Sequence, residues 1–197
     1  MRLLVLARHG LSLFNVDGVV NGDPARDRGL APLGIEEARG LASQIAALAI
    51  DGCAVSTFPR AQQTARLALG ARADSVPTTV DPDLDDIRVG DLEGGTLADY
   101  RAWKHGRSRD DSFPGGESLN ASARRYADAY ERLLTRPENT ILCICHEVPV
   151  RYAVNAAAGS GELDGPLHDV ANATPYLFDA EALSSAIARM RGLASTT

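Results

Sequence analysis

Cysteine is scarce in this 197-residue sequence, and no long apolar run occurs in it. The cysteines are Cys53, Cys143 and Cys145, and two of them lie inside one apolar run, which favours packed, reduced thiols over a disulfide framework. No spacing of Cys and His matches a structural zinc site. The first residues contain too few apolar positions before Arg8 for a signal peptide or a membrane span, and no later run is long enough. We therefore expect a cytoplasmic protein with no metal and no membrane contact.

Positive charge is also in short supply. The formal net charge is -6 and the sequence pI is about 5.2. A nucleic-acid-binding protein needs a positive surface to displace counterions from phosphates, so this class is disfavoured. An anionic ligand must instead find a local cluster of cations. Hydrophobic residues make up 45% of the chain, which is enough for one substantial core, and we expect a single domain over residues 1–197.

The apolar pattern alternates between strand-like and helix-like segments. Short branched-apolar segments predict strands at residues 2–7, 53–57, 140–145 and 175–178. Apolar residues at helical spacing predict helices over residues 32–50, 61–69, 97–107, 119–136, 149–158 and 181–192. Strands that alternate with helices predict an α/β fold, a three-layer sandwich in which a mostly parallel sheet is flanked by helices.

Two arginines and two histidines follow predicted strands closely. Arg8 and His9 come after the first strand, Arg60 after the second and His146 after the third. Because ligands of such sheets bind at the carboxyl edge of parallel strands, we expect all four side chains to meet at one rim. Two guanidinium groups and two imidazoles form a pocket for a compact dianion such as a phosphoryl group.

The chemistry of this set favours phosphoryl transfer without a cofactor. A neutral imidazole can attack phosphorus and form a phosphohistidine, while the remaining positive groups hold the equatorial oxygens. No magnesium is needed if arginine and histidine supply that charge. A carboxylic acid must still protonate the departing alkoxide. The acidic segment that follows the second helix supplies five candidates, between which periodicity cannot choose: Asp83, Asp85, Asp86, Asp91 and Glu93.

Short motifs along nearly the whole chain occur in the order known from one family. They are LARHG at 6–10, LAPLG at 30–34, PRAQQTA at 59–65, LDDIRVGDLEG at 84–94, PGGES at 114–118 and CH at 145–146. The set resembles the histidine phosphatase superfamily, in its phosphoglycerate-mutase-like branch. The resemblance implies His9 as the nucleophile, with Asp86 as the proton donor. It also implies a phosphate pocket and substrate contacts made by Arg8, Asn15, Arg60 and His146.

Asp86 stands where Glu is the more frequent residue in this branch. Three other positions also depart from the family pattern: Leu11 stands where a polar residue is common, Ala31 where Thr is common and Glu147 where a small residue is common. We expect a phosphatase acting on a small phosphorylated metabolite. A phosphoglycerate-mutase-type isomerase and a diverged, non-catalytic phosphate-binding module stay open as alternatives. A homodimer stays open as well, because the sequence is silent on oligomeric state.

Overall fold

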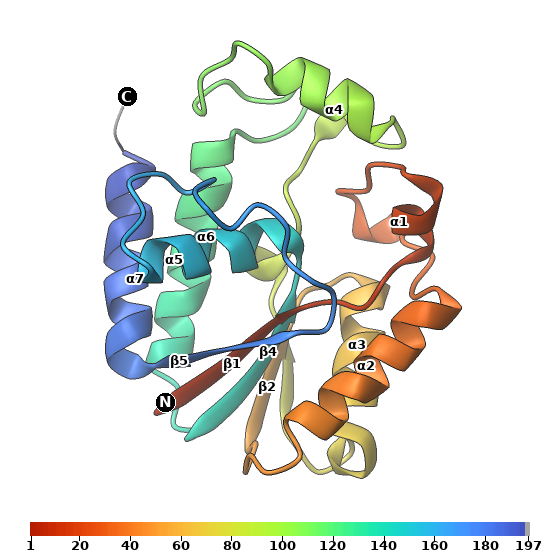
Figure 1. Cartoon of the computed structure of the whole chain (residues 1–197), viewed down its shortest axis with the longest axis vertical. Coiled ribbons are helices and arrows are strands. Elements are labelled where there is room, and N and C mark those ends of the chain that lie inside the picture. The colour runs from red at the N-terminus through yellow and green to blue at the C-terminus, as the bar shows by residue number, and fades with distance from the viewer. Residues whose placement is uncertain (196–197) are drawn as a thin grey trace.

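A five-stranded sheet lies between two layers of helices in the computed structural model, which describes residues 1–195 (Figure 1). The strand order is β3-β2-β4-β1-β5. Four strands run parallel and β5 is antiparallel to β1, so the predicted three-layer α/β fold with a mostly parallel sheet is confirmed. The strands are β1 (Leu3–Arg8), β2 (Gly52–Val55), β3 (Thr78–Val80), β4 (Thr140–Cys145) and β5 (Pro175–Asp179).

Alternate residues of the central strands supply two separate apolar clusters. In β1, Leu4 and Leu6 face one cluster, whereas Val5 and Ala7 face the other. The same alternation divides β4, because successive side chains of a strand point to opposite faces. A strand that is buried on both faces reads as a continuous apolar run, which is why these segments were predictable from the sequence.

The helices fall into two layers and an outer group. One face of the sheet carries α2 and α3, and the other carries α5, α6 and α7, while α1 and α4 lie beyond the carboxyl ends of the parallel strands (Figure 1). The helices are α1 (Leu13–Asp17), α2 (Pro32–Gln44), α3 (Pro59–Leu69), α4 (Leu97–Lys104), α5 (Leu119–Leu134), α6 (Glu147–Ala157) and α7 (Ala180–Leu193).

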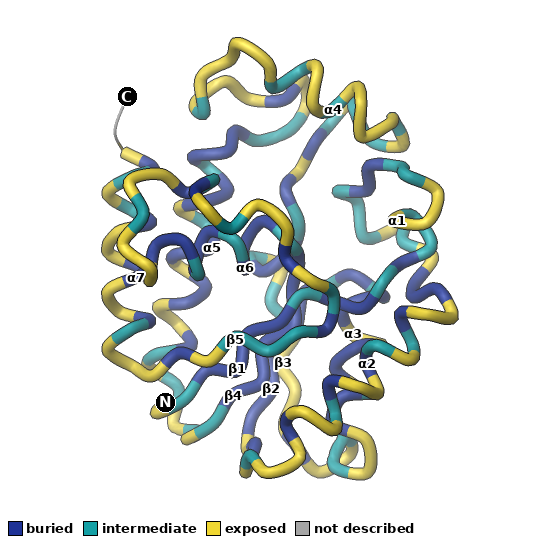
Figure 2. Tube along the Cα trace, in the orientation of Figure 1, coloured by how far each residue is buried: buried dark blue, intermediate teal, exposed yellow. Residues whose placement is uncertain are grey.

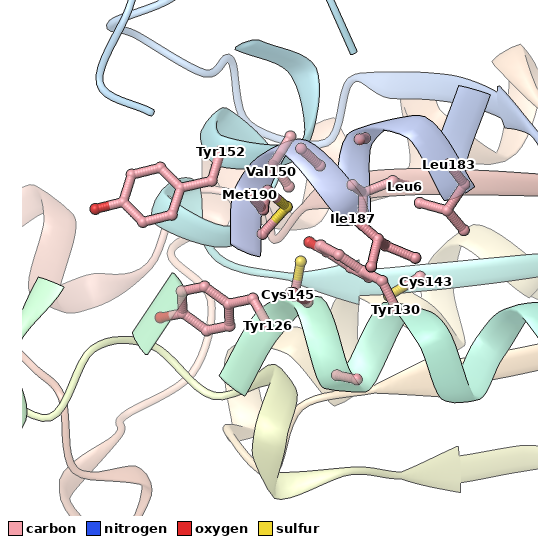
Figure 3. Close-up of a cluster of buried hydrophobic side chains, with 14 of the residues drawn as sticks. Leu6, Tyr126, Tyr130, Cys143, Cys145, Val150, Tyr152, Leu183, Ile187 and Met190 are labelled. Carbon is pink, nitrogen blue, oxygen red and sulfur yellow. The ribbon is translucent and has the colours of Figure 1, made fainter. Parts of the chain in front are cut away.

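The larger cluster fills the space between the sheet and α5, α6 and α7. Figure 3 shows the ring of Tyr130 beside Cys145, with Ile187 of α7 close by. All three cysteines are buried as free thiols, without a disulfide. Buried residues are concentrated in the sheet and on the inner faces of the helices, whereas α4 contains none (Figure 2). Within residues 1–195, no helix combines the length and apolar character that a membrane crossing requires.

The helix predicted over residues 97–107 ends at Lys104 and the strand predicted over 53–57 ends at Val55, and three larger differences concern whole segments. The helix predicted to reach residue 50 ends at Gln44, because the chain turns there to enter β2, and Ile45 and Ile50 join the core from that turn. Strand β3 was missed because its three residues are exposed at the sheet edge and carry no apolar pattern. Helix α1 was missed although Ser12 and Asn15 form a capping box before it.

Candidate active site

The carboxyl ends of β1, β2 and β4 bring distant segments of the chain together. Backbone N–H of His9 donates to the carbonyl of Cys145 (3.0 Å), and that of Ser56 donates to the carbonyl of Ile144 (3.2 Å). These bonds extend the parallel ladders by one residue, just where the strands end. His9, Ser56 and His146 therefore emerge side by side at one rim.

His9 is held in one orientation by its neighbours. Its Nδ1 lies 2.7 Å from the carbonyl oxygen of Gly10, which can only accept, so Nδ1 carries the hydrogen. Nε2 is then the unprotonated nitrogen, and its lone pair accepts a hydrogen bond from Nε of Arg60 (3.0 Å). Burial lowers the pKa of His9 well below its ordinary value, and the charges of Arg60 and Arg8 lower it further. The ring is neutral, with a lone pair on Nε2.

The turn after His9 needs two glycines because two backbones touch there. A Cβ on Gly10 would lie 2.4 Å from the carbonyl oxygen of Gly34, and one on Gly34 would lie 2.1 Å from the carbonyl oxygen of Leu11. N–H of Gly10 donates to the hydroxyl of Thr64 (3.0 Å) in α3. The close contact between this turn and the start of α2 fixes the position of the His9 backbone.

The guanidinium of Arg60 contacts both histidines and the carboxylates of Asp27 and Asp86. The residue is only 3% exposed. Besides its bond to His9, its NH2 lies 3.2 Å from Nδ1 of His146, and its NH1 lies 3.3 Å from a carboxylate oxygen of Asp27. The side-chain oxygen of Asn21 accepts from NH1 as well. Asp27 also accepts from the backbone N–H of Arg60 (2.8 Å), so both ends of this residue are fixed.

His146 is fully buried at the start of α6. Its Nε2 lies 2.8 Å from Oγ of Ser56, and its ring centroid is 5.2 Å from that of His9. Because Arg60 can only donate to Nδ1, the hydrogen of the neutral ring sits on Nε2 and points to Ser56. Burial lowers the pKa of His146 well below its ordinary value, and Arg60 contributes in the same direction.

Arg8 lies at the wall of the site and not against the His9 ring. Its NH1 donates to the carbonyl of Val170 (2.7 Å) and forms an ion pair with Glu147 (3.2 Å). Its Nε is buried without a hydrogen-bond partner among residues 1–195. The structure thus brings His9, Arg60 and His146 into direct contact, with Arg8 on the lining of the same cavity.

Geometry separates the five acidic candidates. Oδ2 of Asp86 lies 3.6 Å from Arg60 NH2 and 3.7 Å from His146 Nδ1, and Asp86 lines the cavity. Burial raises the pKa of Asp86 above its ordinary value, the shift expected of an acid that holds its proton. The other candidates, within the described chain, do not line the cavity. Asp83 pairs with Arg132, Asp85 accepts from Thr57, Asp91 packs near Gly115, and Glu93 accepts from Asn21 and Gly22.

Asn15 has a local structural task. Its side-chain oxygen accepts from the backbone N–H and from the hydroxyl of Ser12, which completes the capping box of α1. Asn15 also lines the cavity, at its exposed end. The structure therefore places it near the mouth of the site, with its carboxamide oxygen already engaged.

Above these residues lies a cavity of about 360 Å³. Its upper wall comes from α4, which contributes Tyr100, Arg101 and Lys104. Burial lowers the pKa of Lys104. Among residues 1–195, no cluster of three or more His, Cys, Asp or Glu side chains could hold a metal ion. Sequence reasoning missed several lining or supporting residues, but it had already marked Glu147 as a departure from the family pattern. The missed residues are Asn21, Asp27, Ser56, Arg151 and His168.

Comparison with known proteins agrees with this architecture. The family model of the histidine phosphatase superfamily (branch 1) matches residues 4–191, so the chain belongs to that superfamily. The solved structures that are similar to this chain include proteins named as phosphatases, and its similar curated proteins include ones named as phosphoglycerate mutases.

Three similar proteins illustrate this range. The 2,3-bisphosphoglycerate-dependent phosphoglycerate mutase of Methylobacterium sp. (strain 4-46) is 40% identical over 136 residues, which cover 63% of this chain and 64% of that protein. The chain thus matches slightly less than two thirds of that relative. The alpha-ribazole phosphatase of Shigella flexneri is 27% identical, with a TM-score of 0.74 and 90% of each chain covered. A mycobacterial glucosyl-3-phosphoglycerate phosphatase, solved with VO3, is 26% identical, with a TM-score of 0.70 and coverage of 90% and 92%.

Proposed function

We propose that this protein is a phosphomonoester hydrolase that acts on a small phosphorylated metabolite through a phosphohistidine on His9. The observation that carries the proposal is the unprotonated Nε2 of a buried, neutral His9, which lines the same cavity as Arg60 and Asp86 and packs against the buried ring of His146. A neutral imidazole with a fixed tautomer is a competent nucleophile toward phosphorus.

The proposed reaction has two displacements. As Arg60 turns its N–H groups to the phosphoryl oxygens, Nε2 of His9 is released from its hydrogen bond with Arg60. Nε2 then forms a bond to phosphorus while the bond from phosphorus to the ester oxygen breaks, and Asp86 gives its proton to that oxygen. The Asp86 carboxylate then takes a proton from water, whose oxygen bonds to phosphorus as the N–P bond breaks. Inorganic phosphate leaves, and both side chains return to their first states. Arg60 and Arg8 hold the phosphoryl oxygens during both steps, and the buried ring of His146 positions the guanidinium of Arg60.

Two observations favour hydrolysis. The phosphatases named above match this chain over about nine tenths of both lengths. The carboxyl of Asp86 can act on water in the second step, because it lies at the cavity and keeps a raised pKa. A mutase is the second candidate, and the 40% identity to a phosphoglycerate mutase favours it.

Trapping of the phosphoenzyme tests the proposal. We expect the protein to hydrolyse at least one ester in a broad phosphomonoester panel and to form an acid-labile phosphoprotein. His9→Ala should abolish the phosphoprotein and lower kcat/KM on the order of a thousandfold or more. His105→Ala, at an exposed histidine outside the cavity lining, is the matched control.

The outcomes separate the alternatives. Absence of both turnover and phosphoprotein in the parent protein would refute an enzyme of this type and favour a phosphate-binding module. Interconversion of phosphoglycerates that depends on 2,3-bisphosphoglycerate and exceeds hydrolysis would favour the mutase.

A further inference from the structure

Glu147 places a negative charge on the wall of the cavity. It directly follows His146 and is the first residue of α6. One carboxylate oxygen lies 3.2 Å from NH1 of Arg8, and the other lies 3.1 Å from NH1 of Arg151. All three side chains line the cavity. The carboxylate therefore partly neutralises two of the cations that would otherwise attract an anionic substrate.

The position of Glu147 is enforced from several sides. Arg8 is tied to the carbonyl of Val170, and Arg151 is paired with Asp164 (2.9 Å). Asp164 in turn pairs with Arg109. Neither arginine can turn away from Glu147 without breaking a second contact. The side chain is still 32% exposed, so part of the carboxylate faces the cavity and its solvent.

The cations next to Glu147 are already paired. With Asp86 protonated, the cavity lining contains five arginines and lysines against two acids, Glu147 and Asp169. Two of the five cations, Arg8 and Arg151, form ion pairs with Glu147. A further negative group on this side of the ester would therefore meet a carboxylate whose neighbouring cations are already engaged. Glu147 also acts electrostatically on Asp86, whose pKa it helps to raise.

We propose that Glu147 is a specificity-determining residue that selects phosphomonoesters with a neutral or cationic group near the ester and rejects those with a second negative charge there. The inference rests on the proposed phosphatase function, which it narrows to substrates unlike phosphoglycerates. The competing interpretation is structural: an acid in the first turn of a helix favours the helix dipole, and Glu147 with Arg151 is an ordinary pair at i and i+4. A structural role would not change selectivity between substrates.

The test compares three small phosphomonoesters that differ in charge away from the phosphate. Phosphoethanolamine carries a positive ammonium group, glycerol 3-phosphate carries no further charge, and 3-phosphoglycerate carries a negative carboxylate. Each competes with p-nitrophenyl phosphate, and its inhibition constant is measured for the parent and for Glu147→Gln. Glutamine keeps the size and the hydrogen-bonding oxygen but removes the charge.

We expect the parent to bind 3-phosphoglycerate more weakly than glycerol 3-phosphate. Glu147→Gln should lower the inhibition constant of 3-phosphoglycerate relative to that of glycerol 3-phosphate by roughly tenfold or more. This is the size expected for one charge a few ångströms away in a partly screened site. The ratio of phosphoethanolamine to glycerol 3-phosphate should shift the opposite way. Glu162→Gln removes an exposed charge outside the cavity lining and should leave both ratios unchanged.

Each result decides something. A ratio that moves less than twofold in Glu147→Gln, or equally in Glu162→Gln, would overturn the role of Glu147 while the phosphatase proposal stands. A parent protein that neither hydrolyses p-nitrophenyl phosphate nor forms a phosphoprotein would refute the proposed function, and this inference with it. Thermal unfolding and turnover of p-nitrophenyl phosphate show whether Glu147→Gln is folded.

Discussion

Loss of Arg60 should destabilise the protein as well as inactivate it. The Arg60→Met substitution keeps a long side chain but removes the charge from a residue that is 3% exposed. Its partner Asp27 has no exposed side-chain surface. Breaking a buried ion pair by removing one partner costs about 3–5 kcal/mol, since it leaves an uncompensated charge. Asp27 keeps hydrogen bonds from the backbone N–H of Arg60 and of Gly29. We therefore expect Arg60→Met to lower the free energy of unfolding by about 3 kcal/mol, at the lower end of that range.

Urea unfolding measures this loss. Adding Asp27→Asn to Arg60→Met should recover part of the stability, because the orphaned charge disappears with its partner. Arg66→Met is the control, since Arg66 and Asp74 form an exposed pair, with 76% and 88% of their side chains accessible. Its effect should stay below about 0.5 kcal/mol. If Arg60→Met cost less than about 1 kcal/mol, the buried pair would not have the importance that we assign to it.

Three further perturbations test the site and its support. Asp86→Asn should lower kcat/KM for an alkyl phosphate on the order of 100-fold, but far less for p-nitrophenyl phosphate, whose leaving group needs no proton; equal losses in steady-state assays would contradict this. Gly10→Ala should lower Tm, because its Cβ would lie 2.4 Å from a carbonyl oxygen of α2, whereas Gly40→Ala meets no atom within 4 Å and should not. Burial lowers the pKa of His9 and His146 below 6.5, so the unfolded chain binds more protons in acid. Unfolding free energy should therefore fall from pH 6.5 to about 5.5, by up to ~1.4 kcal/mol per pH unit for each ring, and a flat profile in urea titrations would argue against two buried neutral rings.

Strand ends made the central residues of the site predictable. His9 and His146 directly follow apolar runs that are buried on both faces, and such runs are hard to mistake for anything else. Parallel strands then require that residues at their carboxyl ends meet. Ser56 follows β2 in the same way, and the same argument would have placed it beside His146.

Residues on irregular segments could not be placed by the same reasoning. Asn21 and Asp27 reach Arg60 from the segment between α1 and α2, whose path depends on tertiary contacts and not on periodicity. The motif pattern proposed Asp86, but five acids share that stretch of sequence. Only coordinates separate a carboxylate 3.6 Å from Arg60 from one that caps a turn or pairs at the surface.

Arg60 combines two roles that conflict in most active sites. A nucleophilic imidazole must be neutral, yet a phosphate pocket must be positive. Burial lowers the pKa of both rings most, and the charge of Arg60 lowers it further, so His9 stays unprotonated; the same charge faces the cavity where a phosphoryl group would lie. Arg8 is shared with Glu147, so Arg60 is the cation in direct contact with both rings. One buried guanidinium thus helps to keep the nucleophile neutral and places a positive charge at the cavity, and Asn21, Asp27 and Asp86 hold it in position.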